Sequence, residues 1–417
     1  MTHPSDQTSP STTGTGETDR QSLEREQFET VDLESLDSGR SLVWVQPLLT
    51  ATVLTVLVGS AIHAVREEAD AITVAAREIA ILDWLYALSL LALAIMVVPT
   101  LVTQRGRVRD VLGRVRKRPL VAVCGGYLVA LLGAGTLYPL FASEPLLDPL
   151  ISLQPPFWTE ISDVYVPTCH GPVVDGQCHG TLDHPLGTNG DGEDLLKIGL
   201  FGLNTSLRVA VTASVLAIVL GIVVGTTAGY VGGLTDELLM RYVDVQRSIP
   251  SFFAYVLLIF VVGVSYPLMI LVFGLLSWGN IARQVRSEVV QRRAEPFVKA
   301  AELSGASSHT VVFRHILPNA SNAVVTAATV LFGKFVIYEA SLSFLSLTET
   351  NFTSLGNEIA GAIGRVSGDV ATPASGPAFD WGMVPWVVLV PVGILCSLLL
   401  AVGVLSDGLR DIADPRK

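Results

Sequence analysis

Apolar residues in this chain are grouped in blocks about as long as a lipid bilayer is thick. The blocks lie at roughly 43–63, 81–101, 120–142, 207–231, 251–278, 320–346 and 384–405. A helix needs about 20 predominantly apolar residues to cross the hydrocarbon core. Only 16% of the 417 residues are charged, compared with about 25% in soluble domains. The chain is therefore predicted to be an all-α polytopic membrane protein, which excludes an ordinary soluble enzyme.

The block at 251–278 decides how many times the chain crosses the membrane. It contains no charged residue. As one helix it would be ~42 Å long, longer than the ~30 Å hydrocarbon core, yet it is too short for two complete spans. It is therefore either one tilted helix or the apolar part of two helices broken near Pro267, the first of which would begin near Glu237.

The distribution of basic residues favours two crossings, because lysine and arginine concentrate in cytoplasmic loops. Segment 102–118 has seven basic residues and one acidic residue, whereas 143–198 has nine acidic residues and one basic residue. Segments 283–318 and 407–417 have six and three basic residues. Both lie on the cytoplasmic side only if 237–282 crosses twice. This predicts about eight transmembrane helices in the cell membrane, with both termini cytoplasmic.

The first 40 residues are polar and carry nine acidic residues against three arginines. They have no apolar period, so 1–40 is predicted to be a disordered acidic cytoplasmic tail. The net charge of −11 does not indicate a nucleic-acid partner, because such a partner requires a basic patch.

The polar segment before the sixth apolar block contains small residues at fixed offsets; residues 298–319 read VKAAELSGASSHTVVFRHILPN. Ala300 and Ala301 would let a short helix approach a partner closely. Gly305 permits a sharp turn without the steric cost of a Cβ atom, and Pro318 suits the first turn of the following span. The alternative is an ordinary amphipathic connector with a glycine turn.

This pattern resembles the EAA loop in the permease subunits of binding-protein-dependent ABC importers. The family pattern is Glu-Ala-Ala, three residues, Gly, nine residues, Ile, one residue and Leu-Pro. The alanine pair, Gly305 and the pair Leu317 and Pro318 are present, whereas Lys299 replaces the usual Glu and His315 the usual Ile. The resemblance implies that this loop couples the permease to its ATPase. Lys299 reverses the charge at one position where the family pattern implies a polar contact with the ATPase.

The resemblance extends over about 120–417, to the dipeptide, oligopeptide and nickel class of these permeases. Matching stretches are His184–Thr188, Gly229–Gly233, Asp236–Asp244, Ser277–Arg286, Glu339–Leu345 and Asp407–Asp411. The class ordinarily has six spans. The implied organisation has three parts. Residues 1–40 are the tail, and 41–118 hold two additional helices and a basic cytoplasmic loop. Residues 119–417 are the permease core formed by the last six helices. Within the core, 143–198 is the external loop and 283–318 the cytoplasmic coupling loop.

The resemblance implies a set of partners as well. Such a permease pairs with a second permease and two ABC ATPase subunits, and an extracellular solute-binding protein delivers dipeptides, oligopeptides or nickel-type ligands. ATP is bound by the separate ATPase subunits. Consistently, Gly333 and Lys334 lack the upstream Gly and following Ser or Thr of a P-loop. The chain is expected to bind no cofactor of its own, no metal and no nucleic acid.

Three glycines, Gly221, Gly225 and Gly229, recur every four residues along one predicted span. Small residues at this spacing allow helix backbones to approach closely in lipid. The contact is either with another helix of the same chain or with the second permease.

Lys334 and Glu339 are ionisable residues inside the block 320–346. Charged side chains at membrane depth are costly and usually face a cavity or a partner. Each of the two is therefore a candidate for the pore, unless it lies close enough to an interface to extend its charge into water. Because they are five residues apart, they point to different faces of a helix and are not expected to pair directly.

Two Cys-His pairs lie nine residues apart in the predicted external loop, at Cys169 and Cys178. Two cysteines and two histidines can form a tetrahedral zinc site. Outside the cytoplasm, however, disulfides persist, and the sequence favours a Cys169–Cys178 disulfide.

Two other classes of function compete with an importer subunit. A gradient-driven secondary transporter without an ATPase would leave the EAA-like loop unexplained. An intramembrane metalloenzyme using the Cys-His loop would need ligands at membrane depth, and none cluster there in the sequence. No Ser/His/Asp set or carboxylate pair indicates catalysis, so the chain is not expected to be an enzyme.

Overall fold

The computed structural model describes residues 40–67, 71–74, 77–103, 105–367 and 384–413. The chain divides into two units, Met1–Val45 and Gln46–Lys417. Of the first unit only residues 40–45 are described, and they form the start of a helix. The predicted tail 1–40 therefore lies outside the described residues, apart from Arg40.

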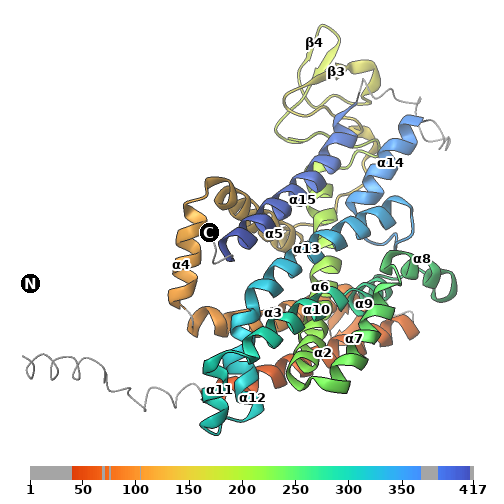
Figure 1. Cartoon of the computed structure of the whole chain (residues 1–417). Helices are drawn as coiled ribbons and strands as arrows, with labels where there is room; N and C mark the ends of the chain where they lie inside the picture. The colour runs from red at the N-terminus through yellow and green to blue at the C-terminus, as the bar shows by residue number, and fades with distance from the viewer. Residues whose placement is uncertain (1–39, 68–70, 75–76, 104, 368–383, 414–417) are drawn as a thin grey trace, which may run out of the picture. The chain divides into compact units, whose positions relative to one another are not determined.

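The described residues are mostly helical (Figure 1). The helices are α2 (Arg40–Glu67), α3 (Ile81–Thr103), α4 (Arg105–Arg116), α5 (Pro119–Phe141), α6 (Leu195–Val231), α7 (Gly233–Arg247), α8 (Ser251–Val262), α9 (Tyr266–Leu276), α10 (Gly279–Arg293), α11 (Pro296–Leu303), α12 (Ser308–Thr310), α13 (Leu317–Phe344), α14 (Leu355–Ser367) and α15 (Trp386–Ala413), with short helical turns η2 (Pro149–Ile151), η3 (Asp163–Tyr165) and η4 (Val311–Ile316). The strands are β1 (Ala71–Val74), β2 (Arg77–Ala80), β3 (Glu160–Ser162), β4 (Val173–Val174) and β5 (Gln177–His179).

Seven helical segments among the described residues are long and apolar enough to cross a membrane. An eighth is added if α7 and α8, which meet at a 70° bend, form one span. The prediction of an all-α membrane protein with about eight spans is confirmed. The strands are a small addition to this fold: β1 pairs with β2, and β3, β5 and β4 form an antiparallel sheet in that order.

The uncharged block 251–278 forms two helices with a break between them, which is the second of the two predicted alternatives. The break lies at 263–265, between α8 and α9. Gly263 has a φ of +97°, which glycine adopts without steric cost. Ser265 then caps α9 by accepting a hydrogen bond from the Leu268 amide at 3.4 Å. Pro267 lies in the first turn of α9, where the missing N–H costs nothing, so it begins the second helix and does not break the first.

Helix α6 is longer than the apolar block that predicted it. Its 37 residues extend ~55 Å. The helix begins at Leu195, whereas the apolar block begins near residue 207. The reason is a cap: the Asp194 carboxylate accepts hydrogen bonds from the amides of Leu196 and Lys197, at 2.9 and 3.1 Å. The external loop predicted at 143–198 accordingly ends a few residues earlier.

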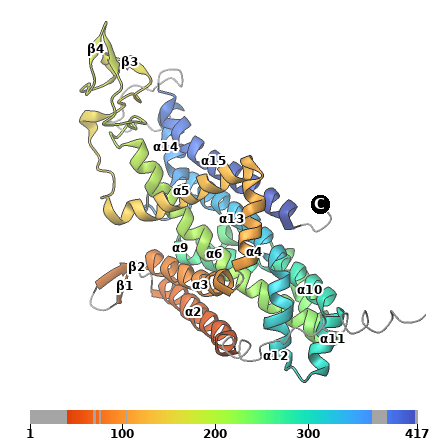
Figure 2. The same ribbon diagram turned by 90° about the vertical axis from the view of Figure 1, so that its left-hand side faces the viewer.

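Helix α6 is also the centre of the helical core. Helices α3, α5, α9, α10 and α13 all pack against it, and Figures 1 and 2 show it running through the middle of the assembled helices. Leu203, Leu207 and Ala213 on α6 are fully buried. The other spans are therefore positioned by their contacts with this helix.

The two additional helices are attached to α6 through polar contacts made by α3. Arg208 on α6 forms an ion pair with Asp83 at 2.7 Å. Ser89 and Thr212 share a hydrogen bond at 3.2 Å. These contacts, which the sequence analysis did not anticipate, join α3 to the core by side chains whose polar groups need partners in lipid.

The glycines at 221, 225 and 229 lie where α6 meets α10. A Cβ atom on Gly221 would lie 2.6 Å from the Cβ of Ile281, and one on Gly229 would lie 2.9 Å from the Cβ of Val289. At Gly225 it would collide with the α10 backbone. Of the two alternatives left open by the sequence, these contacts are with a helix of the same chain.

We predict that Gly225→Ala lowers the stability of the folded chain by about 1–3 kcal/mol, because the added methyl group overpacks the α6–α10 contact. The measurement is the midpoint temperature for loss of the monodisperse peak after heating in mild detergent. The matched control is Gly403→Ala on α15, where a Cβ would meet nothing within 4 Å. An equal midpoint for both variants would contradict the assigned contact.

Candidate coupling segment and buried charges

The segment with the EAA-like pattern is folded as two short helical pieces joined by a turn. Helix α11 is followed by residues 304–307, by α12 and η4, and then directly by α13. The first part of the predicted loop 283–318 is different: residues 283–293 belong to α10. The part that projects between helices is therefore 296–316.

Gly305 forms the turn that ends α11. Its φ is +83°, and the Ala306 amide donates to the Ala301 carbonyl at 3.0 Å. This six-to-one bond after a left-handed glycine is the Schellman arrangement. A Cβ at Gly305 would meet nothing within 4 Å. Glycine is therefore favoured here by the backbone conformation, since a side chain would meet no steric obstacle.

One face of α11 packs on the rest of the segment. Val298 is fully buried and Ala301 partly buried, and they belong to the same apolar cluster as Val311 and Ile316 of the following piece. This small core fixes α11 against η4, so the segment is a defined structure and not a loose connector.

The opposite face of α11 is exposed and largely apolar. Phe297 is 40% and Leu303 89% exposed, and Ala300 between them is exposed as well. These residues are one helical turn apart and form a stripe with a small residue at its centre. Lys299 is exposed beside the stripe. The stripe offers a surface for close approach by another helix or groove.

The remaining residues of the predicted motif lie at the start of α13. Pro318 is in its first turn, as its missing N–H favours, and Leu317 is the first residue of the helix. His315 belongs to η4. The side chains of these three residues lie outside the described part of the structure.

Ion pairs join α10 to α7. The Arg286 guanidinium donates to both carboxylate oxygens of Asp236, and the bond from Nη2 is 2.5 Å long. Asp244 forms an ion pair with Arg283. The sequence analysis placed these four residues in matching stretches without pairing them. Two turns separate the aspartates and one turn separates the arginines, a spacing that could have suggested one shared face on each helix.

Glu339 is fully buried and accepts hydrogen bonds from three serines. Ser206 on α6 donates at 2.5 Å, Ser343 on α13 at 2.9 Å, and Ser354, just before α14, at 2.8 Å. The carboxyl group therefore links three elements. It does not line an open cavity in this conformation.

Lys334 lies on α13 more than one turn before Glu339 and does not pair with it. Its ammonium group donates to the Ser277 hydroxyl at 3.2 Å. It also lies 5.5 Å from the ring centre of Phe335 and 5.2 Å from that of Tyr338, where the negative faces of aromatic rings stabilise a cation. Lys334 is only partly buried, and it remains the better pore candidate of the two.

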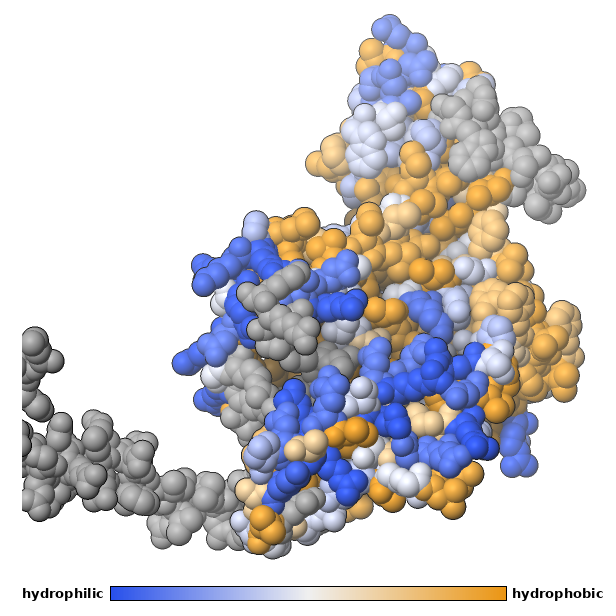
Figure 3. Space-filling view, in the orientation of Figure 1, coloured by the Kyte–Doolittle hydropathy of each residue, from blue (hydrophilic) through white to orange (hydrophobic). Residues whose placement is uncertain are grey.

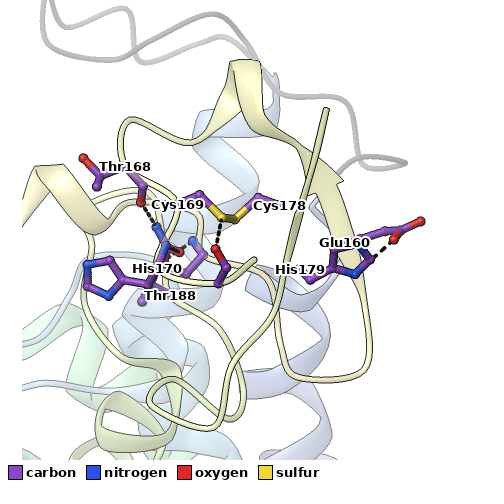
Figure 4. The surroundings of a disulfide bond; sticks show 9 residues. Glu160, Thr168, Cys169, His170, Cys178, His179 and Thr188 are labelled. Atoms are coloured by element: carbon purple, nitrogen blue, oxygen red, sulfur yellow. Dashed lines mark hydrogen bonds and ion pairs between the residues drawn. A yellow bond between two sulfur atoms is a disulfide. The ribbon is translucent and has the colours of Figure 1, made fainter. Parts of the chain in front are cut away.

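Cys169 and Cys178 are joined by a disulfide with an S–S distance of 1.99 Å (Figure 4). His170 and His179 lie on opposite sides of it. The His179 ring contacts the Glu160 carboxylate at 3.2 Å, and the His170 amide donates to the Gln154 side chain at 3.1 Å. With the two sulfurs bonded to each other, the structure does not form the alternative zinc site.

The family stretch beginning at His184 connects this loop to the membrane helices. The His184 ring shares a hydrogen bond with Asp194, the cap of α6, at 3.0 Å. The Trp386 indole on α15 donates to the Thr188 carbonyl at 3.4 Å. The Asn189 side-chain amide donates to the Glu193 carboxylate at 2.8 Å. The loop is therefore fixed to the N-terminal ends of α6 and α15.

Comparison with known proteins agrees with the resemblance found in the sequence. Residues 217–417 match the family described as binding-protein-dependent transport system inner membrane component. The oligopeptide transport system permease protein OppC of Escherichia coli K12 is 37% identical over 234 residues, which is 56% of this chain and 72% of OppC. OppC of Bacillus subtilis is 30% identical and shares 56% of this chain and 72% of its own length.

Two further matches are more distant. The dipeptide transport system permease protein DppC of Lactococcus lactis is 28% identical over 274 residues, 65% of this chain and 75% of DppC. A solved chain of the MetNI methionine ABC transporter, in an inward facing conformation, is 19% identical with a TM-score of 0.34. It covers 49% of this chain and 94% of its own, a similarity too weak for comparing individual helices.

The chain belongs to the family of binding-protein-dependent transport system inner membrane components. The predicted resemblance to ABC importer permeases is thereby confirmed. The protein is a multi-pass membrane protein, and its family is one of transport components and not of enzymes.

We predict that Glu339→Ala destabilises the chain by about 2–5 kcal/mol, because it leaves a cavity and three buried serine hydroxyls without their acceptor. Glu339→Gln, which keeps the volume and one carbonyl oxygen, should cost about 1 kcal/mol. Thermal midpoints in detergent measure both. If the two variants are equally stable, the carboxyl group does not hold α6, α13 and Ser354 together.

Alkylation tests the disulfide. Under denaturing, non-reducing conditions we expect a thiol reagent to modify only Cys124 and Cys396, which are free in the structure, and after reduction to modify all four cysteines. Intact-mass measurement counts the modifications. Four modifications before reduction would contradict the bond.

Proposed function

We propose that this chain is one permease subunit of an ATP-driven ABC importer for peptides. With a second permease it would form the translocation pathway for dipeptides, oligopeptides or nickel-type ligands. The family match over 217–417, together with relatives named as oligopeptide and dipeptide permeases, carries this proposal. In this proposal residues 119–417 form the permease core, and the family match covers its part 217–417.

In this proposal the segment 296–316 is the coupling element that docks on an ATPase subunit. The exposed stripe of Phe297, Ala300 and Leu303 would enter a groove on the ATPase, where Ala300 allows close approach. Lys299 reverses the charge of the usual Glu, so the groove beside it is expected to be neutral or acidic.

The connections of this segment explain how ATPase closure would reach the pore. At one end η4 continues into α13, which carries Lys334 and Glu339. At the other end α10 is joined to α7 by ion pairs and packs closely on the glycines of α6. Displacement of α11 would therefore move α10 and α13, and so switch the cavity between inward-facing and outward-facing states.

The orientation is part of the proposal. Basic segments, including 102–118, would face the cytoplasm, in line with the positive-inside rule, together with both termini. The disulfide-containing loop would face outward and receive the ligand from an extracellular solute-binding protein. ATP would be bound only by the two separate ATPase subunits.

Co-purification tests this function through Gly305. The wild-type chain, extracted in mild detergent from membranes that also contain its ATPase, should bring that ATPase down. Gly305→Val should lose the ATPase, because a β-branched residue is strained at a φ of +83° and the Schellman turn would be displaced. Gly305→Asn should retain it, because asparagine visits this region readily.

A second pair of variants separates docking from folding. Ala300→Trp should abolish co-purification and ATP-dependent peptide uptake, while Val164→Trp, at an 84% exposed position of the external loop, should keep the ATPase. If no ATPase associates with the wild type and uptake follows an ion gradient without ATP, the chain is a secondary transporter and the proposal fails.

A further inference from the structure

The basic helix α4 is tethered to the membrane surface at both ends. It begins two residues after α3 ends, and only Lys117 and Arg118 separate it from α5. Both α3 and α5 are apolar and long enough to cross a membrane. The ends of α4 therefore cannot move more than a few ångströms from the ends of these two spans.

Contacts with the rest of the chain fix the rotation of α4. Val108, Val111 and Val115 are partly buried and lie on one face, and α4 packs against α5 and α15. Immediately after the helix, Arg118 forms an ion pair with Asp411 of α15 at 3.0 Å. The other described residues of α4 are exposed.

One exposed face, about 100° around the helix from the valines, carries a stripe of arginines around one leucine. Arg105, Arg109 and Arg116 are exposed. Leu112, which is 65% exposed, lies three, four and seven residues from Arg109, Arg116 and Arg105, so all four share a face. None of the three arginines has an ion-pair partner in the part of the chain that the structure describes. Figure 3 shows hydrophilic surface gathered over α4.

We propose that this stripe binds the headgroups of anionic phospholipids. Basic clusters immediately next to a span attract anionic lipids, and the guanidinium fork matches a phosphate group. Leu112 can enter the acyl boundary while the long arginine side chains reach the headgroups. The charge is local, because 102–118 has seven basic residues and one acidic residue in a chain of net charge −11.

Residues 1–40 of the same chain carry nine carboxylates and are the alternative anionic partner for the arginine stripe. The membrane is the better-supported occupant, because α3 and α5 hold α4 permanently beside it. The two occupants differ in one measurable respect: binding of the tail would remove the lipid preference of the wild-type chain.

The test uses the full-length chain in phosphatidylcholine vesicles that contain a trace of spin-labelled phosphatidylglycerol or phosphatidylcholine. The motionally restricted fraction of label reports lipid in contact with the protein. The wild type should restrict more phosphatidylglycerol than phosphatidylcholine, and salt should reduce the excess. The variant R105Q/R109Q/R116Q should lose the excess, while R105K/R109K/R116K, the matched control, should keep most of it.

Three results would overturn the proposal. The first is a wild type without preference for phosphatidylglycerol at low salt, which is decisive whether or not the glutamine variant folds. The second is an equal preference in the wild type and the glutamine variant. The third is a preference that emerges only when the nine carboxylates of residues 1–40 are replaced by amides, which would assign the stripe to the tail.

Discussion

Lipid tails are as apolar as leucine, so helices in a membrane gain no hydrophobic free energy by meeting one another and must associate through close packing and polar contacts. The contact between α6 and α10 satisfies this requirement through three glycines that bring the backbones together. Nearly everything else is arranged around it. Helix α6 contacts eight other described helices, and α10 continues α9 and leads into the projecting α11. The proposed coupling segment, 296–316, is thus attached to the most tightly packed pair in the core.

Polar groups in the core follow the same constraint, since an unsatisfied group in hydrocarbon has no water to bind. Glu339 is surrounded by three serine hydroxyls from α6, α13 and the residue before α14, and Lys334 by a serine hydroxyl and two aromatic rings. Lys334 and Glu339 are five positions apart, which places these groups on different faces of α13. One therefore acts as an internal link, whereas the other is partly exposed, and only the second could meet a passing ligand without first breaking the core.

The sequence predicted features that depend on composition or on local backbone geometry. The spans follow from apolar length, and the turn at Gly305 follows from the conformations open to glycine. It did not predict the start of α6, because the cap Asp194 lies in a polar stretch that reads as loop. It also could not predict the pairing of Asp236 with Arg286 or of Glu339 with Ser206. Such pairs depend on which helices are neighbours and on their register, and local periodicity determines neither.

The attachment of α3 restricts how the proposed transport cycle can move the core. Breaking the Arg208–Asp83 pair would leave a largely buried guanidinium, with 15% of its side chain exposed, without its counter-charge, and an unpaired charge within the membrane is costly. Helix α3 should therefore remain joined to α6 throughout the cycle. The coupling segment, in contrast, is continuous with α13 and directly follows α10. Motion driven from α11 is then most easily accommodated where α10 packs on α6, because these contacts are formed by glycines and aliphatic side chains. Helix α13 stays linked to α6 through Glu339 and Ser206.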